Sequence, residues 1–170
     1  DLRNSVKIVD EVLAAEPENI EALVLRGQLY REEGNLAAAV TFWSRVPETD
    51  REQCAVARFL QATVAFEQRL LSKGEELLKV AKRLNPQYLL PRERLVRLHI
   101  LLLRTKQARE ELEELRTLRS WTVQDLSQYR MSYDIIDNPQ SVIPLLEKYL
   151  RADPVHNDCR IALIRYLKAA

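Results

Sequence analysis

Residues that break helices are scarce in this 170-residue chain. It contains only three glycines and seven prolines, whereas Leu, Glu, Arg and Ala are abundant. This balance favours an all-α protein over a fold rich in turns and strands. Hydrophobic residues make up 46% of the chain, which is ample for a buried core.

An excess of one charge and a long apolar run are also missing. The 26 basic and 25 acidic residues leave a net charge of +1, which argues against a nucleic-acid binder that relies on bulk charge. The longest apolar candidate, residues 99–103, is far short of the roughly 18 residues that a membrane helix needs. We therefore expect neither a nucleic-acid partner nor membrane insertion.

The N-terminus has no charged-then-apolar leader, so no secretory signal is visible. The chain begins without Met and directly in an amphipathic pattern, which leads us to expect a fragment of a longer protein. The two cysteines, expected to be unpaired, favour a reduced compartment such as the cytoplasm.

A unit of about 34 residues recurs along the chain, and a period in this range indicates a solenoid of repeats. The clearest copy runs from Ile20 to about Ala55 and is followed by similar units that end at Pro86 and Pro154. Its characteristic residues are small, aromatic or turn-forming: Ala22, Gly27, Tyr30, Gly34, Ala39 and Trp43.

The period predicts about ten helices in one repeat domain covering residues 1–170. The predicted units are the second helix of a preceding repeat (2–17), four repeats (20–54, 55–88, 89–122 and 123–156) and the first helix of a following repeat (157–170). Apolar residues at helical spacing support the helices in residues 2–15, 107–119 and 141–152.

Turn residues fit this frame. Gly34 is expected to end a helix in the left-handed conformation, and Pro47 predicts that the second helix of the first repeat ends near Val46. Pro144 is compatible with a helix if Ser141 caps it, because first-turn amides have no partner within the helix.

The residues from Ala22 to Val46 resemble the tetratricopeptide repeat family, and by period the resemblance covers essentially the whole chain. It implies a right-handed superhelix of antiparallel helix hairpins, in which Gly27 and Ala39 let the two helices of a repeat approach closely. The match weakens along the chain, where Val96, Arg130 and Val142 stand at positions for small residues.

Catalytic and metal-binding motifs are missing. The glycines are too scattered for a phosphate loop, and no HExxH or CxxC occurs. His99 stands where Tyr30 stands in the first repeat, so we interpret it as a core residue and not as a ligand or base. Cys54 and Cys159 are interpreted as small buried residues; a reactive pair of Cys159 with His156 lacks a third orienting group. We expect no enzyme activity, cofactor or metal.

Charged and aromatic side chains have similar structural interpretations. The cluster Glu110–Glu114 is expected to be a solvated helix face with local pairs to Arg109, Arg116 and Arg119. Trp43 is expected to pack within its repeat, and Trp121 to lie between repeats.

In the resembling family the first helix of each repeat lines the inner, concave groove. By register this implies a groove that is apolar in its first half and basic later: Val24, Leu25, Gln28, Arg31, Phe59, Leu60, Thr63, Phe66, Glu93, Arg94, Arg97, Leu101, Ser127, Gln128, Met131, Arg165 and Lys168. The alternative is that Phe59 and Phe66 pack within and between repeats. The family's carboxylate clamp looks absent, because Val24 and Gln28 stand where its Lys and Asn are needed.

The resemblance implies a non-enzymatic scaffold that binds a protein, as a peptide or helix, in this groove. Apolar faces on the terminal helices would also permit self-association. The alternatives are a regulatory or spacer arm of a larger enzyme or sensor and, less favoured by the charge balance, an RNA-binding helical repeat.

Overall fold

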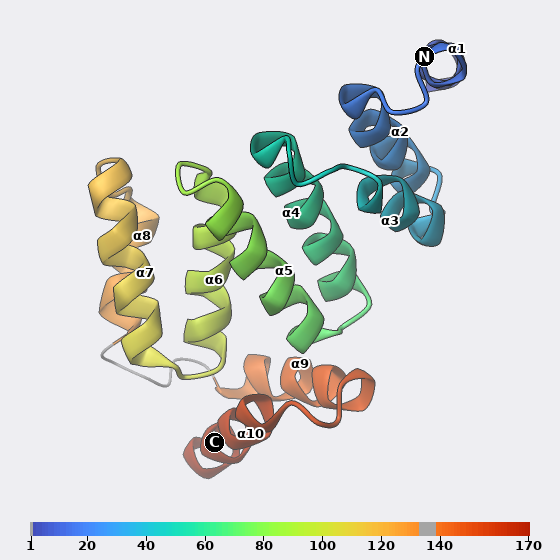
Figure 1. Cartoon of the computed structure of the whole chain (residues 1–170). Helices are drawn as coiled ribbons and strands as arrows, with labels where there is room; N and C mark the ends of the chain where they lie inside the picture. The colour runs from blue at the N-terminus through green and yellow to red at the C-terminus, as the bar shows by residue number, and fades with distance from the viewer. Residues whose placement is uncertain (1, 133–138) are drawn as a thin grey trace.

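The computed structural model describes residues 2–132 and 139–170, with the backbone alone at Leu2 and Arg130. Within these ranges the predicted all-α fold of ten helices in sequential antiparallel pairs is confirmed (Figure 1). In the described ranges, no helix has the length and apolar character needed to cross a membrane. The helices are α1 (Leu2–Ala15), α2 (Ile20–Glu32), α3 (Leu36–Ser44), α4 (Arg51–Glu67), α5 (Leu71–Leu84), α6 (Leu89–Leu101), α7 (Thr105–Leu118), α8 (Val123–Met131), α9 (Pro139–Ala152) and α10 (Asn157–Ala169).

The same turn closes the first helix of three consecutive pairs. Gly34, Arg69 and Leu103 all have positive φ, at 82°, 64° and 57°, and they lie 35 and 34 residues apart. In each turn the next amide donates across six residues to a helix carbonyl at 2.8 Å, as from Asn35 to Tyr30. This pattern is the Schellman ending, in which a left-handed residue satisfies the last carbonyls. The repeat of the sequence is therefore also a repeat of backbone geometry.

Small residues allow the helices from α2 to α7 to stack closely. Ala39, Ala62, Ala81 and Ala108 are fully buried. At Gly27 the nearest neighbour is Trp43: a Cβ on Gly27 would lie 2.3 Å from Trp43 Nε1. The indole of Trp43 is fully buried and donates to the Val24 carbonyl at 3.1 Å. Gly27 is therefore small because it makes room for this ring.

Four boundaries differ from the prediction. Helix α4 begins at Arg51, not near Ala55, because the Asp50 side chain accepts from the Gln53 amide and caps it. Helix α3 already ends at Ser44, and α7 begins at Thr105. Helix α9 begins at Pro139, so Pro144 lies inside the helix and not in a first turn capped by Ser141. Proline is favoured at a first helical position, which explains the earlier start.

The glutamate cluster on α7 is more than a solvated face. Glu111 is only 9% exposed, and Lys82 on α5 pairs with both Glu111 (2.7 Å) and Glu114 (2.9 Å). Arg92 on α6 also pairs with Glu114. Glu110 and Glu113 pair within α7, with Lys106 and Arg116. The predicted pairing within the helix is therefore wrong for Glu111 and Glu114, which pair with residues of α5 and α6.

The last two helices leave the direction of the stack. Helix α8 packs on α6 and α7, whereas α9 packs on α10, and the α9–α10 hairpin lies across the lower ends of the stacked helices (Figure 1). Leu146, Cys159 and Tyr166 of the hairpin share a core with Leu71 and Leu102. The predicted fourth repeat, in which α8 would pair with α9, is therefore not the dominant packing among the described residues. Tyr133 and the turn at Asn138, which belong to that repeat, lie outside the described residues, as does the side chain of Arg130.

Candidate functional site

The predicted groove residues on α2, α4 and α6 fall into three groups. Some belong to the core: Val24 is 8% exposed, so its expected exposure in the groove is wrong. Phe59 is half-buried and packs edge-on against Tyr88, with ring centroids 5.5 Å apart. The half-buried Thr63 donates its hydroxyl to the Phe59 carbonyl. Leu25 is exposed and Glu93 pairs with Arg119, so neither lines a hollow. The other seven residues line two hollows.

The first hollow lies between α2 and α4 and has a volume of about 570 Å³. Gln28, Arg31 and Leu60, all predicted groove residues, line it together with Glu32 and Glu67. Arg31 and Glu67 form an ion pair that joins the ends of the two helices. Because this arginine already has a carboxylate partner and Glu32 adds a second carboxylate, the first hollow is polar and has no excess of positive charge.

The second hollow is a smaller cavity of about 130 Å³ where α4 and α6 meet α9. Four predicted groove residues line it, Phe66, Arg94, Arg97 and Leu101, and they are joined by Leu71, Leu98 and Tyr149. Tyr149 comes from α9, so this cavity includes a residue 48 or more positions away from the others in sequence. We call it the α4–α6–α9 cavity.

The phenol of Tyr149 is half-buried against this cavity. Burial raises its pKa above the ordinary value, and the guanidinium groups of Arg69 and Arg94 oppose part of that shift. The hydroxyl therefore stays protonated at neutral pH. The cavity thus presents an apolar interior with positive charge beside it.

The other predicted groove residues do not join these hollows. Gln128 is half-buried and Met131 is 38% exposed, both on α8. Arg165 is exposed on α10, and α10 packs on α9 and does not continue the row of first helices behind α8. The period therefore predicted groove residues on α8 and α10 that do not line the two hollows on α2, α4 and α6.

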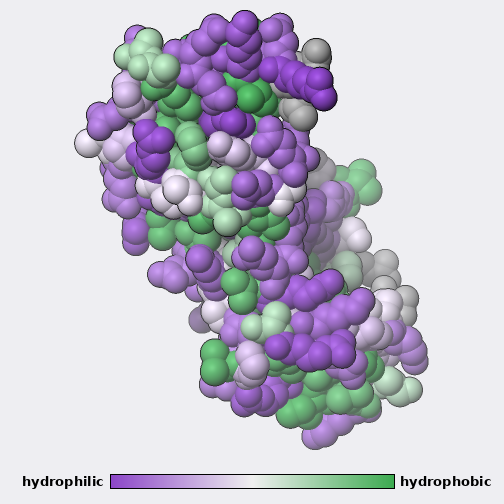
Figure 2. Space-filling model, turned by 90° about the vertical axis from the view of Figure 1, so that its right-hand side faces the viewer, coloured by the Kyte–Doolittle hydropathy of each residue, from purple (hydrophilic) through white to green (hydrophobic). Residues whose placement is uncertain are grey.

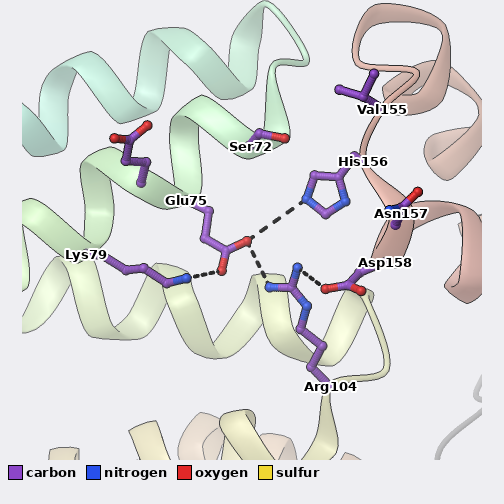
Figure 3. A pocket seen from close by; sticks show the side chains of 9 residues that line it. Ser72, Glu75, Lys79, Arg104, Val155, His156, Asn157 and Asp158 are labelled. Carbon is purple, nitrogen blue, oxygen red and sulfur yellow. Dashed lines mark hydrogen bonds and ion pairs between the residues drawn. The ribbon is translucent and has the colours of Figure 1, made fainter.

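A third, polar pocket of about 430 Å³ lies where the hairpin meets the stack (Figure 3). Glu75 on α5 is at its centre: Lys79 Nζ lies 2.6 Å and Arg104 Nη1 2.8 Å from its carboxylate oxygens, and His156 Nε2 lies 4.0 Å away. Arg104 also reaches Asp158 at 2.5 Å. Burial acts to raise the pKa of Glu75, but the hydrogen bonds from Lys79 and Arg104 outweigh it and hold the pKa below the ordinary value.

Next to this pocket, the hairpin supplies a cap for α5. The helix has no cap from its own Leu70, but Asp153 accepts from the Ser72 amide at 3.0 Å and from its hydroxyl at 2.8 Å. A carboxylate here satisfies free amides of the first turn and complements the helix dipole. The polar pocket and this cap thus hold the hairpin in place and together form the polar seam.

The histidine and the cysteine of the seam have structural contacts. His156 Nδ1 accepts from the Cys159 amide at 3.1 Å and so caps α10, while Cys159 Sγ contacts the Leu146 carbonyl at 3.7 Å. Burial raises the pKa of the Cys159 thiol to about 11, so the nucleophilic thiolate is not populated. Cys54 and Cys159 are both free and buried, as predicted. In the described ranges no group of three or more metal-ligating side chains comes together.

Seven of the residues predicted on α2, α4 and α6 line the two hollows, but the part played by Tyr149 and the seam were not predicted from the sequence. The pattern identifies Tyr149 only as part of the apolar stripe of its own helix. Its role in the cavity depends on where the hairpin docks, and the repeat period does not predict that position. The one available signal is the weakening of the repeat pattern in the fourth unit.

The fold defines a class: an all-α array of helices in sequential antiparallel pairs. Crystal structures of MamA, a tetratricopeptide-repeat protein, have this fold. One has a TM-score of 0.64 at 18% identity over 91% of this chain and 84% of that chain; another has 0.63 at 16% over 99% and 88%. At such identities the likeness concerns the fold. No protein-family model and no curated protein sequence matches.

Proposed function

We propose that this chain is a non-enzymatic scaffold that binds a peptide or a short helix of another protein along the inner helices α2, α4 and α6. The observation that carries the proposal is the pair of hollows on these consecutive helices, each lined by residues of the inner face. The fold likeness to MamA supports a protein-interaction role in general terms.

The surface supports binding at this place better than a purely architectural role. Leu101 lies half-buried in a cavity that side chains of the chain do not fill, beside the exposed Arg94 and Arg97. Concave sites with apolar walls and a few polar groups are the usual places for recognition. A spacer would need neither the open cavity nor the uncovered cations.

Hydrogen exchange can test this proposal before any natural partner is identified. Short peptides selected from a random displayed library on the immobilised chain would be added to the chain in solution. We expect their binding to slow amide exchange in α2, α4 and α6, while α3 and α7 on the other side of each pair change little. Protection limited to the outer helices would refute the proposal, as would a selection that yields no binding peptide.

The terminal helices keep their separate prediction of self-association. Ile8 on α1 is 52% exposed, and Ile161 and Leu167 on α10 are 50% and 53% exposed. Figure 2 shows hydrophobic patches at the end of the molecule that the hairpin forms. The measurement that checks this prediction is the molar mass by light scattering over a dilution series.

A further inference from the structure

The α4–α6–α9 cavity has firmly placed apolar walls. Leu71 is fully buried and Leu98 is 6% exposed. The Phe66 ring lies over Gly74, where a Cβ would come within 2.6 Å of the ring. The ring therefore occupies space that only glycine leaves open. These contacts fix the walls before any partner arrives, which lowers the entropic cost of binding.

The size of the cavity suits one side chain. An engineered cavity of about 150 Å³ lined by Leu, Ile and Phe in another protein holds a benzene molecule. The volume here, about 130 Å³, is slightly smaller, and the apolar part of its wall, Phe66, Leu71, Leu98 and Leu101, is of the same kind. It therefore fits a branched aliphatic side chain and is too small for a cofactor.

The two arginines beside the cavity differ from five other arginines of the chain, each of which pairs with a carboxylate. Arg26 pairs with Asp10, Arg31 with Glu67, Arg92 with Glu114, Arg104 with Glu75 and Arg119 with Asp125. Arg94 and Arg97 are exposed, and among the described residues neither is within ion-pair distance of a carboxylate. They lie one helical turn apart on α6, so both can face the same ligand.

We propose that the α4–α6–α9 cavity is the anchor point for an acidic peptide segment, taking one Leu- or Ile-type side chain while neighbouring Asp or Glu residues pair with Arg94 and Arg97. This inference rests on the proposed scaffold function and names its partner chemistry. Guanidinium groups bind carboxylates through two parallel hydrogen bonds, so a pair of them selects acidic neighbours of the anchor.

The anchor point also depends on the hairpin. Tyr149 supplies the wall from α9, and α9 is held by Asp153 on Ser72 and by Asp158 on Arg104. If the hairpin shifts, the cavity loses this wall although no inner-helix residue changes. Peptide binding is therefore coupled to the integrity of a seam outside the cavity.

The peptides selected on the immobilised chain provide the probe for this test. They would be synthesised with a fluorescent label, and their affinities measured by anisotropy. We expect the selected sequences to share one aliphatic residue flanked by Asp or Glu. Changing that aliphatic residue to Ala, or the acidic residues to Asn and Gln, should each weaken binding by about tenfold or more.

Variants of the chain complete the test. The double variant Arg94→Glu, Arg97→Glu changes exposed residues, so it should keep its circular dichroism spectrum and lose affinity by about a hundredfold. The matched control Arg83→Glu, an exposed arginine on α5, should change affinity little. Asp153→Ala should weaken binding although it does not line the cavity.

The outcomes separate the two proposals. Peptides that protect the inner helices but lack acidic residues, or that bind the double variant as well as the parent, would overturn the anchor point and leave the scaffold function standing. A selection without binders would overturn both. Unchanged affinity in Asp153→Ala, with hydrogen exchange showing a released hairpin, would overturn the part played by α9.

Discussion

The stack from α2 to α7 and the α9–α10 hairpin are both built of antiparallel helices, but they attach differently. In the stack each helix packs on its neighbours in sequence, and the same turn recurs at 35 and 34 residues. The hairpin bypasses α8 and docks on the start of α5 and the turn after α6, through the shared core and the polar seam. A sequence period therefore reflects contacts between neighbouring helices. It carries no information on where the α9–α10 hairpin docks.

The largest expected difference between the stack and the later part of the chain concerns the two tryptophans. Each indole donates to a backbone carbonyl of a preceding helix, Trp43 to Val24 and Trp121 to Leu112. Trp43 is fully buried, whereas Trp121 is half-buried where α7 meets α8. We expect Trp43→Ala to lower the free energy of unfolding by about 4 kcal/mol and Trp121→Ala by about 2 kcal/mol, measured by urea denaturation. Equal losses would mean that α8 is packed as firmly as the stack.

Acidification should weaken the junction between the two regions. His99 on α6 is 4% exposed, and burial lowers its pKa to about 4; Glu75 opposes this shift, while Arg104, Lys79 and Lys82 add to it. The unfolded histidine has an ordinary pKa of 6.5. The stability it contributes is therefore present above pH 6.5 and is lost as the pH falls from 6.5 towards 4.

Urea denaturation between pH 7 and pH 4 measures this loss. We expect the free energy of unfolding to fall by about 3 kcal/mol more in the parent than in the variant His99→Leu, which cannot take up the proton. Parallel pH profiles for the two proteins would show that His99 is not held neutral.

A smaller, local effect is expected from the cap that the hairpin supplies to α5. Asp153→Ala removes the acceptor for the Ser72 amide and hydroxyl, so it should cost about 1 to 2 kcal/mol. Hydrogen exchange should accelerate in α9, α10 and the first turn of α5, and not in α2 and α3. Glu147→Ala, an exposed change on α9, is the control. Equal acceleration throughout the chain would show that the hairpin is not a separate unit.

The smallest effect concerns the repeated turn. Arg69 and Leu103 adopt the left-handed conformation that Gly34 adopts at little cost. Arg69→Gly should therefore raise the free energy of unfolding by about 1 kcal/mol. Leu103 is only 7% exposed and belongs to the core shared with the hairpin. Leu103→Gly should destabilise the protein, because lost burial outweighs relief of strain. A loss of stability in Arg69→Gly would contradict this account.

The sequence was sufficient for those parts of the fold that depend on neighbours. The predicted starts at Ile20, Leu89, Val123 and Asn157 are the starts of helices, because local apolar periodicity and caps determine them. It failed for Val24 and Glu111, which looked like surface residues in a single helix but face Trp43 and Lys82 of others. It also failed for the hairpin, because no local sequence feature of Asp153 or Asp158 predicts that they contact Ser72 and Arg104, which are distant in the chain.

The cap on Ser72 has a further consequence for the order in which this protein folds. It joins residues 81 positions apart, whereas contacts in an ordinary repeat array are short-range and folding can start anywhere. Closing so long a loop is entropically costly until its ends already have partners to meet. Helices α2 to α7 can therefore pack on one another as soon as neighbouring pairs are made, whereas the α9–α10 hairpin can dock only after α5 and the turn after α6 are in place.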